Sequence, residues 1–307
     1  MKHLTFRYGL AALLCLPISG LAQDMTPVPN LITYSFQTVN FPGDSFTQLL
    51  GINKAGTIAG YHGSGAAGHP NQGFTLTLPS TFTSENFPGS VQTQVIGINN
   101  AGDTGGFYID TAGANHGFLK VGSAFKTVDF PGTTSVPAVN QLLGLNNANQ
   151  VAGFYADAAG NSHGYVYART GGVFSVFFIP LVASAQATGV NQAGNVCGFF
   201  VSKGGVTHGF TLIGGVFGGL NFPGATSTTA FGLNNNGQVV GTYTDAGGLV
   251  HGFVFKGGSF QPVDDPSGVG ATIINGINDK GVIVGFFGSC TTGGSTCDGF
   301  VGTPTGP

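Results

Sequence analysis

Residues 229–266 read TAFGLNNNGQVVGTYTDAGGLVHGFVFKGGSFQPVDDP, and this stretch decides the fold. It contains four short runs rich in β-branched and aromatic residues, separated by turns of Asn, Asp and Gly. The runs cover Thr229–Asn234, Gln238–Thr244, Gly252–Lys256 and Phe260–Asp264. Because turns of about two to five residues join antiparallel neighbours, the stretch predicts a four-stranded antiparallel sheet.

The same phrases recur six times along the chain. A Gly-aliphatic-Asn phrase, a Gly-aromatic phrase and a proline-terminated run each occur six times. The asparagines are Asn53, Asn99, Asn146, Asn191, Asn234 and Asn278, the aromatics Phe74, Phe118, Tyr165, Phe210, Phe253 and Phe300, and the prolines Pro42, Pro88, Pro131, Pro180, Pro223 and Pro266. Successive asparagines are 43 to 47 residues apart, which is the size of one propeller blade, about 40–45 residues.

The two ends of the chain indicate a closed ring. The sixth unit stops at Gly299-Phe300-Val301, without a proline-terminated run, whereas the first unit is preceded by such a run at Phe36–Pro42. An N-terminal strand that completes the last blade removes the open edge of a circular array. We therefore expect an all-β fold, a six-bladed β-propeller of ~45-residue four-stranded repeats, in which residues 23–307 form a single domain.

The first 22 residues have the pattern of a signal peptide. Lys2 and Arg7 precede an apolar run from Tyr8 to Ile18, and Gly20-Leu21-Ala22 supplies small residues at a cleavage site. We expect cleavage after Ala22 and a secreted protein, extracellular or periplasmic, without a membrane anchor.

The charge of the chain argues against nucleic acid as a partner. Nine Lys and Arg against twelve Asp and Glu give a net charge of −3, and removal of Lys2 and Arg7 changes it to 7 − 12 = −5. Binding to polyanions needs clustered cations, and the remaining lysines are scattered. We expect a monomer that uses no cofactor.

The Gly-Ile-Asn-x-x-Gly-x-Val-Val-Gly phrase with a following His-small-aromatic phrase resembles the bacterial extracellular HAF-repeat proteins. The resemblance covers roughly residues 31–301, with His-Gly in place of His-Ala at His116, His163, His208 and His251. Gln72 and Asp298 replace the histidine in two units, and Phe178-Ile179-Pro180-Leu181 replaces Asn-Phe-Pro-Gly. The resemblance implies a secreted propeller-type repeat protein and transfers no catalytic residue.

Aspartate and histidine bracket the second hairpin of three units at a constant separation of six. The pairs are Asp110 with His116, Asp157 with His163, and Asp245 with His251, while Ser202 takes the aspartate position before His208. Such a pair supplies two ligands where zinc needs three or four, so we expect no metal. Two interpretations stay open, namely a hydrogen-bonded clasp of the hairpin or a surface that binds a ligand or a metal ion.

Two other recurring residues also admit two interpretations. The asparagines suit the turn between the first and second strands, since Asn tolerates left-handed backbone, but six amides could also form a ligand-binding ring. Phe41, Phe87, Phe130 and Phe222 precede Pro-Gly in an expected type II turn. They are expected to wedge between blades, and a surface platform for sugars is the alternative.

The three cysteines beyond the leader have different expected states. Cys290 and Cys297 flank one hairpin, and in an exported protein we expect them to form a disulfide. Cys197 occupies a strand position held by small apolar residues in the other units, so we expect a buried free thiol.

No sequence pattern supports catalysis. Glu85 is the only glutamate of the chain, and there is no paired-carboxylate pattern, Gly-x-Ser-x-Gly elbow or His-Glu-x-x-His stretch. We therefore expect a binding or surface-interaction module for extracellular glycan or protein. Its contact face would carry the Asp/His hairpins and the Phe-Pro-Gly turns, opposite the Asn turns. The alternative is a secreted hydrolase or lyase with a site at the central channel.

Overall fold

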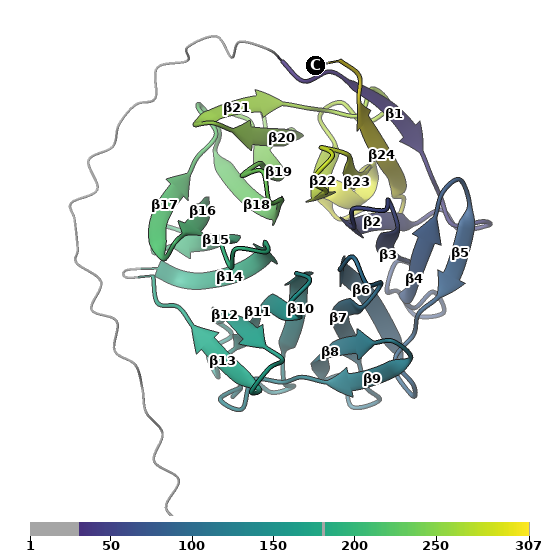
Figure 1. Cartoon of the computed structure of the whole chain (residues 1–307), viewed down its shortest axis with the longest axis vertical. Helices are drawn as coiled ribbons and strands as arrows, with labels where there is room; N and C mark the ends of the chain where they lie inside the picture. Colours follow the sequence, from purple (N-terminus) through teal and green to yellow (C-terminus); the bar gives the residue numbers. More distant parts are fainter. Residues whose placement is uncertain (1–30, 180–181, 307) are drawn as a thin grey trace, which may run out of the picture.

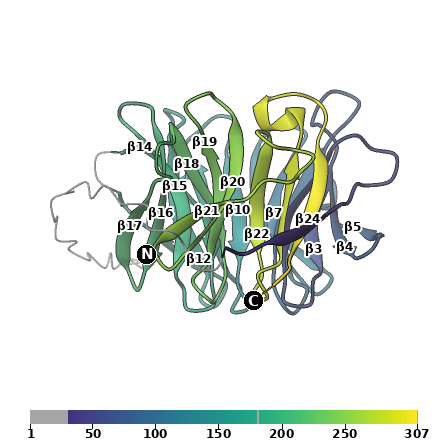
Figure 2. The ribbon, with the colours of Figure 1, turned by 90° about the horizontal axis from the view of Figure 1, so that it is seen from above.

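The computed structural model describes residues 31–179 and 182–306, which form six four-stranded antiparallel sheets arranged as blades around an axis (Figure 1). Seen from the side, the strands run between the two faces of a disc (Figure 2). The predicted fold, an all-β six-bladed propeller, is confirmed. In the described ranges the helical content is the short 3₁₀ helix η1 (Ser289–Thr292). The predicted signal peptide, residues 1–22, lies outside them.

Five blades use four consecutive strands, and the sixth combines the last three strands of the chain with the first. The strands are β2 (Thr47–Ile52), β3 (Ile58–His62), β4 (Gln72–Thr77) and β5 (Thr81–Ser84) in blade 1; β6 (Gln92–Ile98), β7 (Thr104–Ile109), β8 (Asn115–Val121) and β9 (Ala124–Thr127) in blade 2; β10 (Asn140–Leu145), β11 (Gln150–Ala156), β12 (Ser162–Ala168) and β13 (Val173–Val176) in blade 3; β14 (Val182–Val190), β15 (Val196–Ser202), β16 (Thr207–Ile213) and β17 (Val216–Leu220) in blade 4; β18 (Ser227–Leu233), β19 (Val239–Thr244), β20 (Val250–Lys256) and β21 (Ser259–Pro262) in blade 5; and β22 (Thr272–Ile277), β23 (Ile283–Phe287), β24 (Asp298–Pro304) and β1 (Tyr34–Thr38) in blade 6.

The predicted closure of the ring occurs in blade 6. Strand β1 pairs antiparallel with β24, with Tyr34 opposite Pro304 and Thr38 opposite Phe300. The pairing continues beyond the strand, because the Val39 amide donates to the carbonyl of Gly299 at 2.8 Å. The outermost strand of the last blade is therefore contributed by the beginning of the described chain, so no blade lacks its fourth strand (Figure 1).

The Gly-aromatic phrase forms the centre of every blade. Its six aromatic rings are all fully buried: Phe74, Phe118, Tyr165, Phe210, Phe253 and Phe300. The neighbouring second strand has a glycine against this ring because no side chain fits there. A Cβ atom on Gly285, for example, would lie 2.0 Å from the carbonyl oxygen of Ile273 and 2.8 Å from the Phe300 ring. Glycine permits the backbone to approach this closely.

The repeated asparagines connect neighbouring blades as well as shaping turns. The Oδ1 atom of Asn278 accepts from the amides of Lys280 and Val282, at 3.0 and 3.1 Å, which is the expected turn role. Its Nδ2 atom donates to the backbone carbonyl of Asn53 in the next blade at 3.1 Å. The same inter-blade bond leads from Asn53 to Asn99, Asn146 to Asn191, Asn191 to Asn234 and Asn234 to Asn278. We call this series the asparagine belt.

The belt deviates at one position. Asn99 donates instead to the side chains of Asp103 and Asn149, at 3.1 and 3.0 Å. The six amides are thus engaged on both their oxygen and nitrogen atoms, which leaves little capacity for a ligand. The geometry supports the turn interpretation of these residues over the ligand-binding ring.

The Phe-Pro-Gly segments form tight turns at the ends of the outer strands. In each, the amide three residues after the phenylalanine donates to its carbonyl, as from Asp44 to Phe41 at 3.1 Å. Gly43, Gly89 and Gly224 have positive φ angles, between 77° and 80°, as a type II turn requires. Gly132 does not, so the turn after Phe130 differs from the expected type.

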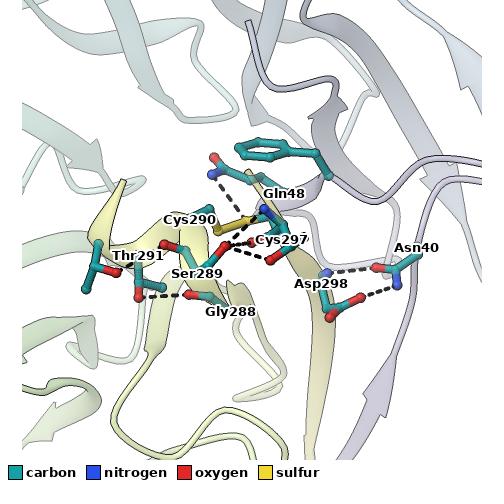
Figure 3. The surroundings of a disulfide bond; sticks show 12 residues. Asn40, Gln48, Gly288, Ser289, Cys290, Thr291, Cys297 and Asp298 are labelled. Carbon is teal, nitrogen blue, oxygen red and sulfur yellow. Dashed lines mark hydrogen bonds between the residues drawn. A yellow bond between two sulfur atoms is a disulfide. The ribbon is translucent and has the colours of Figure 1, made fainter. Parts of the chain in front are cut away.

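The cysteines are arranged in two ways. Cys290 and Cys297, the pair expected to form a disulfide, are joined by one in the β23–β24 connection (Figure 3). The side-chain amide of Gln48 from blade 1 lies 3.5 Å from the Cys297 sulfur. Cys197 has a free thiol and is fully buried between blades 4 and 5. Burial raises the pKa of this thiol to about 12.

Candidate functional site

The three Asp–His pairs meet across their hairpins. The distance from the Nε2 atom of the histidine to the Oδ2 atom of the aspartate is 3.3 Å for His116 and Asp110. It is 2.9 Å for His163 and Asp157, and 3.6 Å for His251 and Asp245. The connections after the second and fourth strands adjoin on this side of the disc, as where the Val91 amide donates to the Ile109 carbonyl. We call this side the hairpin face.

The aspartate of each pair also organises its own hairpin. The Oδ1 atom of Asp110 accepts from the amides of Ala112 and Ala114, at 2.8 and 2.9 Å. Asp157 does the same for Ala159 and Asn161. These carboxylates therefore have one oxygen committed to the turn and one facing the imidazole, which fits the clasp interpretation.

Two of the histidines touch a second carboxylate that the sequence analysis did not identify. The Nδ1 atom of His116 lies 2.6 Å from Asp129, and that of His251 lies 2.6 Å from Asp264. The Oδ1 atom of each aspartate accepts a hydrogen bond from the backbone amide of the glycine that follows the histidine. These aspartates stand one residue before the Phe-Pro-Gly position of their unit. Other units have Asn40, Asn86 and Asn221 at this position, so aligning the repeats would have identified it as a polar position.

The carboxylates determine the protonation of these groups. Burial acts to lower the pKa of His116, but Asp129 and Asp110 outweigh it and raise that pKa above its usual value. The hydrogen bond from His163, followed by the Asn161 amide, lowers the pKa of Asp157 to about 2. The pKa of Asp110 is also lowered, first by the Ala114 amide. The face therefore presents ionised carboxylates beside imidazoles at neutral pH.

An aromatic stack lies beneath each of the three paired histidines, at the boundary between two blades. In blade 2, the ring of Phe87 from blade 1 stacks on Tyr108 with centroids 3.8 Å apart, and Tyr108 stacks on His116 at 5.1 Å. Phe130, Tyr155 and His163 repeat this order, as do Phe222, Tyr243 and His251. The phenylalanines are thus wedged between blades, as one interpretation expected. The tyrosine covers one face of each phenylalanine ring, which weakens the alternative that these phenylalanines form an open platform for sugars.

The remaining blades carry variants of this arrangement. In blade 4, His208 stacks on Phe200 and has Asn221 at 2.8 Å in place of a carboxylate. In blade 6, Asp298 takes the histidine position and accepts from the Asn40 side chain at 2.5 Å (Figure 3). Blade 1 has Gln72 there. Full Asp–His pairs therefore occupy three blades of six.

The central channel is lined by other chemistry. A cavity of about 290 Å³ lies between the innermost strands, where bulged residues such as Leu50, Ile96 and Phe231 line it with Thr188 and Asn275. No titratable side chain is among its described lining residues. A smaller cavity of about 90 Å³ lies among the Asn turns. The main cavity therefore offers no acid, base or carboxylate, whereas Lys54 and Asp279 are among the residues that line the smaller one.

Neither a metal cluster nor a membrane span is found in the described ranges. No group of three His, Cys, Asp or Glu side chains gathers there in a way that could hold a metal ion. Residues 31–179 and 182–306 likewise contain no helix that is long and apolar enough to cross a membrane.

Comparisons with known proteins identify the fold without a family. No protein-family description matches the chain, and no curated protein matches it. Among solved structures, it is similar to an Aleuria aurantia lectin mutant in complex with Fucα1-6GlcNAc, at 12% identity over 90% of this chain and 97% of that one, with a TM-score of 0.51. It is also similar to the SapL1 lectin in complex with α-methyl fucoside, at 10% identity over 81% and 89%, with a TM-score of 0.52. A putative TolB from Agrobacterium tumefaciens aligns at 10% identity over 76% and 89%, with a TM-score of 0.56. At these identities the likeness concerns the propeller fold.

Proposed function

We propose that this protein is a secreted carbohydrate-binding module of HAF-repeat type, and that the hairpin face contacts the ligand. One observation carries the proposal. Three blades repeat the same group on this face, an imidazole beside at least one carboxylate and above a tyrosine ring. The ligand-contacting residues are Asp110, His116, Asp157, His163, His208, Asp245 and His251.

The chemistry of these groups suits sugars. Carboxylate and imidazole atoms can accept and donate hydrogen bonds to hydroxyl groups. The Asp157 and His163 side chains are 30% and 39% exposed, so both are accessible to a ligand. A neutral polymer also avoids the repulsion that these carboxylates would impose on a polyanion.

The ring arrangement adds multivalency. Repeated weak sites on one rigid disc raise the effective concentration of each site once the first is occupied. This favours a repetitive ligand, such as an extracellular polysaccharide, over a single small sugar. Two lectins with similar folds support the proposal, because their structures were solved in complex with Fucα1-6GlcNAc and α-methyl fucoside.

A glycan array tests the proposal. The double variant His116→Ala and His251→Ala should lose retention on those glycans that hold the wild type, because it removes two imidazoles from the face. The matched control is Ser80→Ala with Ser123→Ala, two exposed serines in turns on the opposite face. The proposal fails if no glycan retains the wild type, or if the histidine variant is retained as well as the control.

A further inference from the structure

The second hairpin of blade 1 departs from the repeat. The strands β3 and β4 are separated by nine residues, 63–71, whereas β7 and β8 in blade 2 are separated by five, 110–114. The longer connection reads Gly63-Ser64-Gly65-Ala66-Ala67-Gly68-His69-Pro70-Asn71. The β23–β24 connection of blade 6, residues 288–297, is also long, but the disulfide closes it. Of these two long connections, the one in blade 1 carries both a hydroxyl and an imidazole, and loops that depart from a repeat are often where a repeat protein carries a specific function.

These two groups are in line with a carboxylate. The Oγ atom of Ser64 lies 3.1 Å from Nδ1 of His69. On the other side of the same ring, Nε2 of His69 lies 2.9 Å from Oδ2 of Asp44. Serine, histidine and aspartate are therefore connected through opposite nitrogens of a single imidazole, the order that a nucleophile, its base and an orienting acid require.

The hydrogen bonds around His69 select its tautomer. Nδ1 also receives the backbone amide of Ser64, at 3.2 Å, and an amide can only donate. Nδ1 is therefore the lone-pair nitrogen, and the proton is on Nε2, where Asp44 accepts it. In this tautomer the imidazole can take the proton of the Ser64 hydroxyl.

Asp44 is held as an anion. Its side chain is only 8% exposed, and burial alone would raise its pKa. Hydrogen bonds from His62, His69 and the Phe46 amide outweigh that effect and hold the pKa below its usual value. His62 donates from Nδ1 at 2.8 Å while its ring stacks on Phe41 at 3.6 Å, so the carboxylate is fixed on both sides.

The surroundings of Ser64 indicate the kind of substrate. Ser64 and His69 are partly exposed, and the two cavities described above lie at the channel, away from this loop. A small acyl group can reach the partly exposed Ser64 from solvent without entering either of these two cavities. The Ser64 hydroxyl also accepts from the Ala66 amide at 3.4 Å, so its oxygen is held beside the imidazole by the loop backbone.

We propose that Ser64, His69 and Asp44 form a hydrolytic triad that cleaves carboxylic esters with short acyl groups. The Ser64 oxygen attacks the ester carbonyl carbon while His69 Nδ1 takes the hydroxyl proton. The bond from the carbonyl carbon to the alcohol oxygen breaks, and His69 protonates the departing alcohol. Water then attacks the acyl-serine with His69 again as base, which releases the carboxylic acid and restores Ser64. Asp44 is the positioning residue, and this activity is independent of glycan binding.

A fluorophosphonate probe followed by peptide mapping tests the nucleophile. The adduct should be on Ser64 and not on Ser202, which begins the corresponding hairpin of blade 4 and lies beside no imidazole acceptor. Hydrolysis of p-nitrophenyl acetate should fall by at least about 100-fold in Ser64→Ala and in His69→Gln, the range expected for loss of a nucleophile or general base. Ser123→Ala, which removes an exposed hydroxyl from a turn on the opposite face, should leave the rate unchanged.

Two further variants separate catalysis from hairpin stability. Asp44→Asn should lower kcat at least about tenfold with little change in KM, because it disturbs the base without touching substrate. In Ser64→Cys, iodoacetamide should alkylate the thiol faster than in Ser202→Cys, and His69→Gln should abolish the difference. The proposal is overturned if Ser64 takes no probe, if its alanine variant keeps full esterase activity, or if the two cysteine variants react equally fast.

Discussion

Gly105 and Gly106 are neighbours in β7, yet they tolerate a side chain very differently. A Cβ atom on Gly106 would lie 2.0 Å from the Gln94 carbonyl oxygen, whereas on Gly105 the nearest atom would be 3.6 Å away. We expect Gly106→Ala to lower the free energy of unfolding by roughly 1–3 kcal/mol through overpacking. Gly105→Ala, the control, should be neutral or slightly stabilising. Urea titration measures both, and equal effects would contradict the packing described.

The carboxylate of Asp157 predicts an acid-labile contribution to stability. Its folded pKa, about 2, is below the ordinary value of 3.8. A lowered pKa stabilises the fold above the ordinary value, and this contribution is lost as pH falls from about 4 to about 2. In thermal melts over that range, the wild type should lose more stability than Asp157→Asn. Parallel curves for the two proteins would show that the clasp has no energetic role.

The three Asp–His pairs were predictable because a separation of six is visible within each repeat. Asp129 and Asp264 were not, since their contact with a histidine joins the third strand to the end of the fourth across the blade. The Ser64 group was not predictable either. Asp44 lies 25 residues before His69, in the connection from β1 to β2, and no spacing that recurs in the other units links the two.

The β23–β24 connection is the one hairpin among the described blades with a covalent link. Cys290 and Cys297 close a loop with a sequence separation of seven. Loop-closure entropy predicts that replacing both with serine lowers the free energy of unfolding by about 2 kcal/mol. Guanidinium unfolding measures the change, and the reduced wild type is the control that should match the double variant. A wild type that is unaffected by reduction would contradict this prediction.

Strand identity was predictable from the pattern, but strand bounds were less so. The first strand was expected at Phe36–Pro42 and is observed at Tyr34–Thr38, because Asn40 and Phe41 leave the ladder to contact Gly299 and blade 1. The bulge in each innermost strand lies directly before the glycine of the Gly-aliphatic-Asn phrase. The phrase therefore marks its position, but the shift of the ladder there becomes visible only in the paired strands.

Closure of the ring is the main prediction at the scale of the whole molecule. Deleting residues 31–40 removes β1 and exposes the edge of β24. It also uncovers Phe300, whose ring centroid lies 5.6 Å from that of Phe36. We expect a lower melting temperature for the entire propeller and a tendency to aggregate through the free edge. Adding a peptide of residues 31–44 in trans should restore the melting temperature. A truncated protein that melts unchanged would contradict the closure.

The number of blades and their order around the axis were readable from six copies and an offset end. The asparagine belt was not, because each amide reaches the carbonyl of the neighbouring repeat. Sequence periodicity alone gives the positions of the asparagines. It does not give the curvature of the ring, which brings the Nδ2 atom of Asn191 within 3.2 Å of the Asn234 carbonyl oxygen in the next blade. The resemblance to HAF-repeat proteins stays a prediction, since no family description matches the chain.

The pairing of β1 with β24 also determines how the disc responds to tension. Tyr34, where the described chain enters the ladder, lies opposite Pro304, where it leaves. A pull applied at these two points acts on the same end of the ladder, so hydrogen bonds are loaded one after another and not all together. Under such a pull the seam therefore opens progressively, one residue pair after another. This strand pair and the two hydrogen bonds between Ile32 and Gln261 of blade 5 resist the opening, however stable the remaining five blades are.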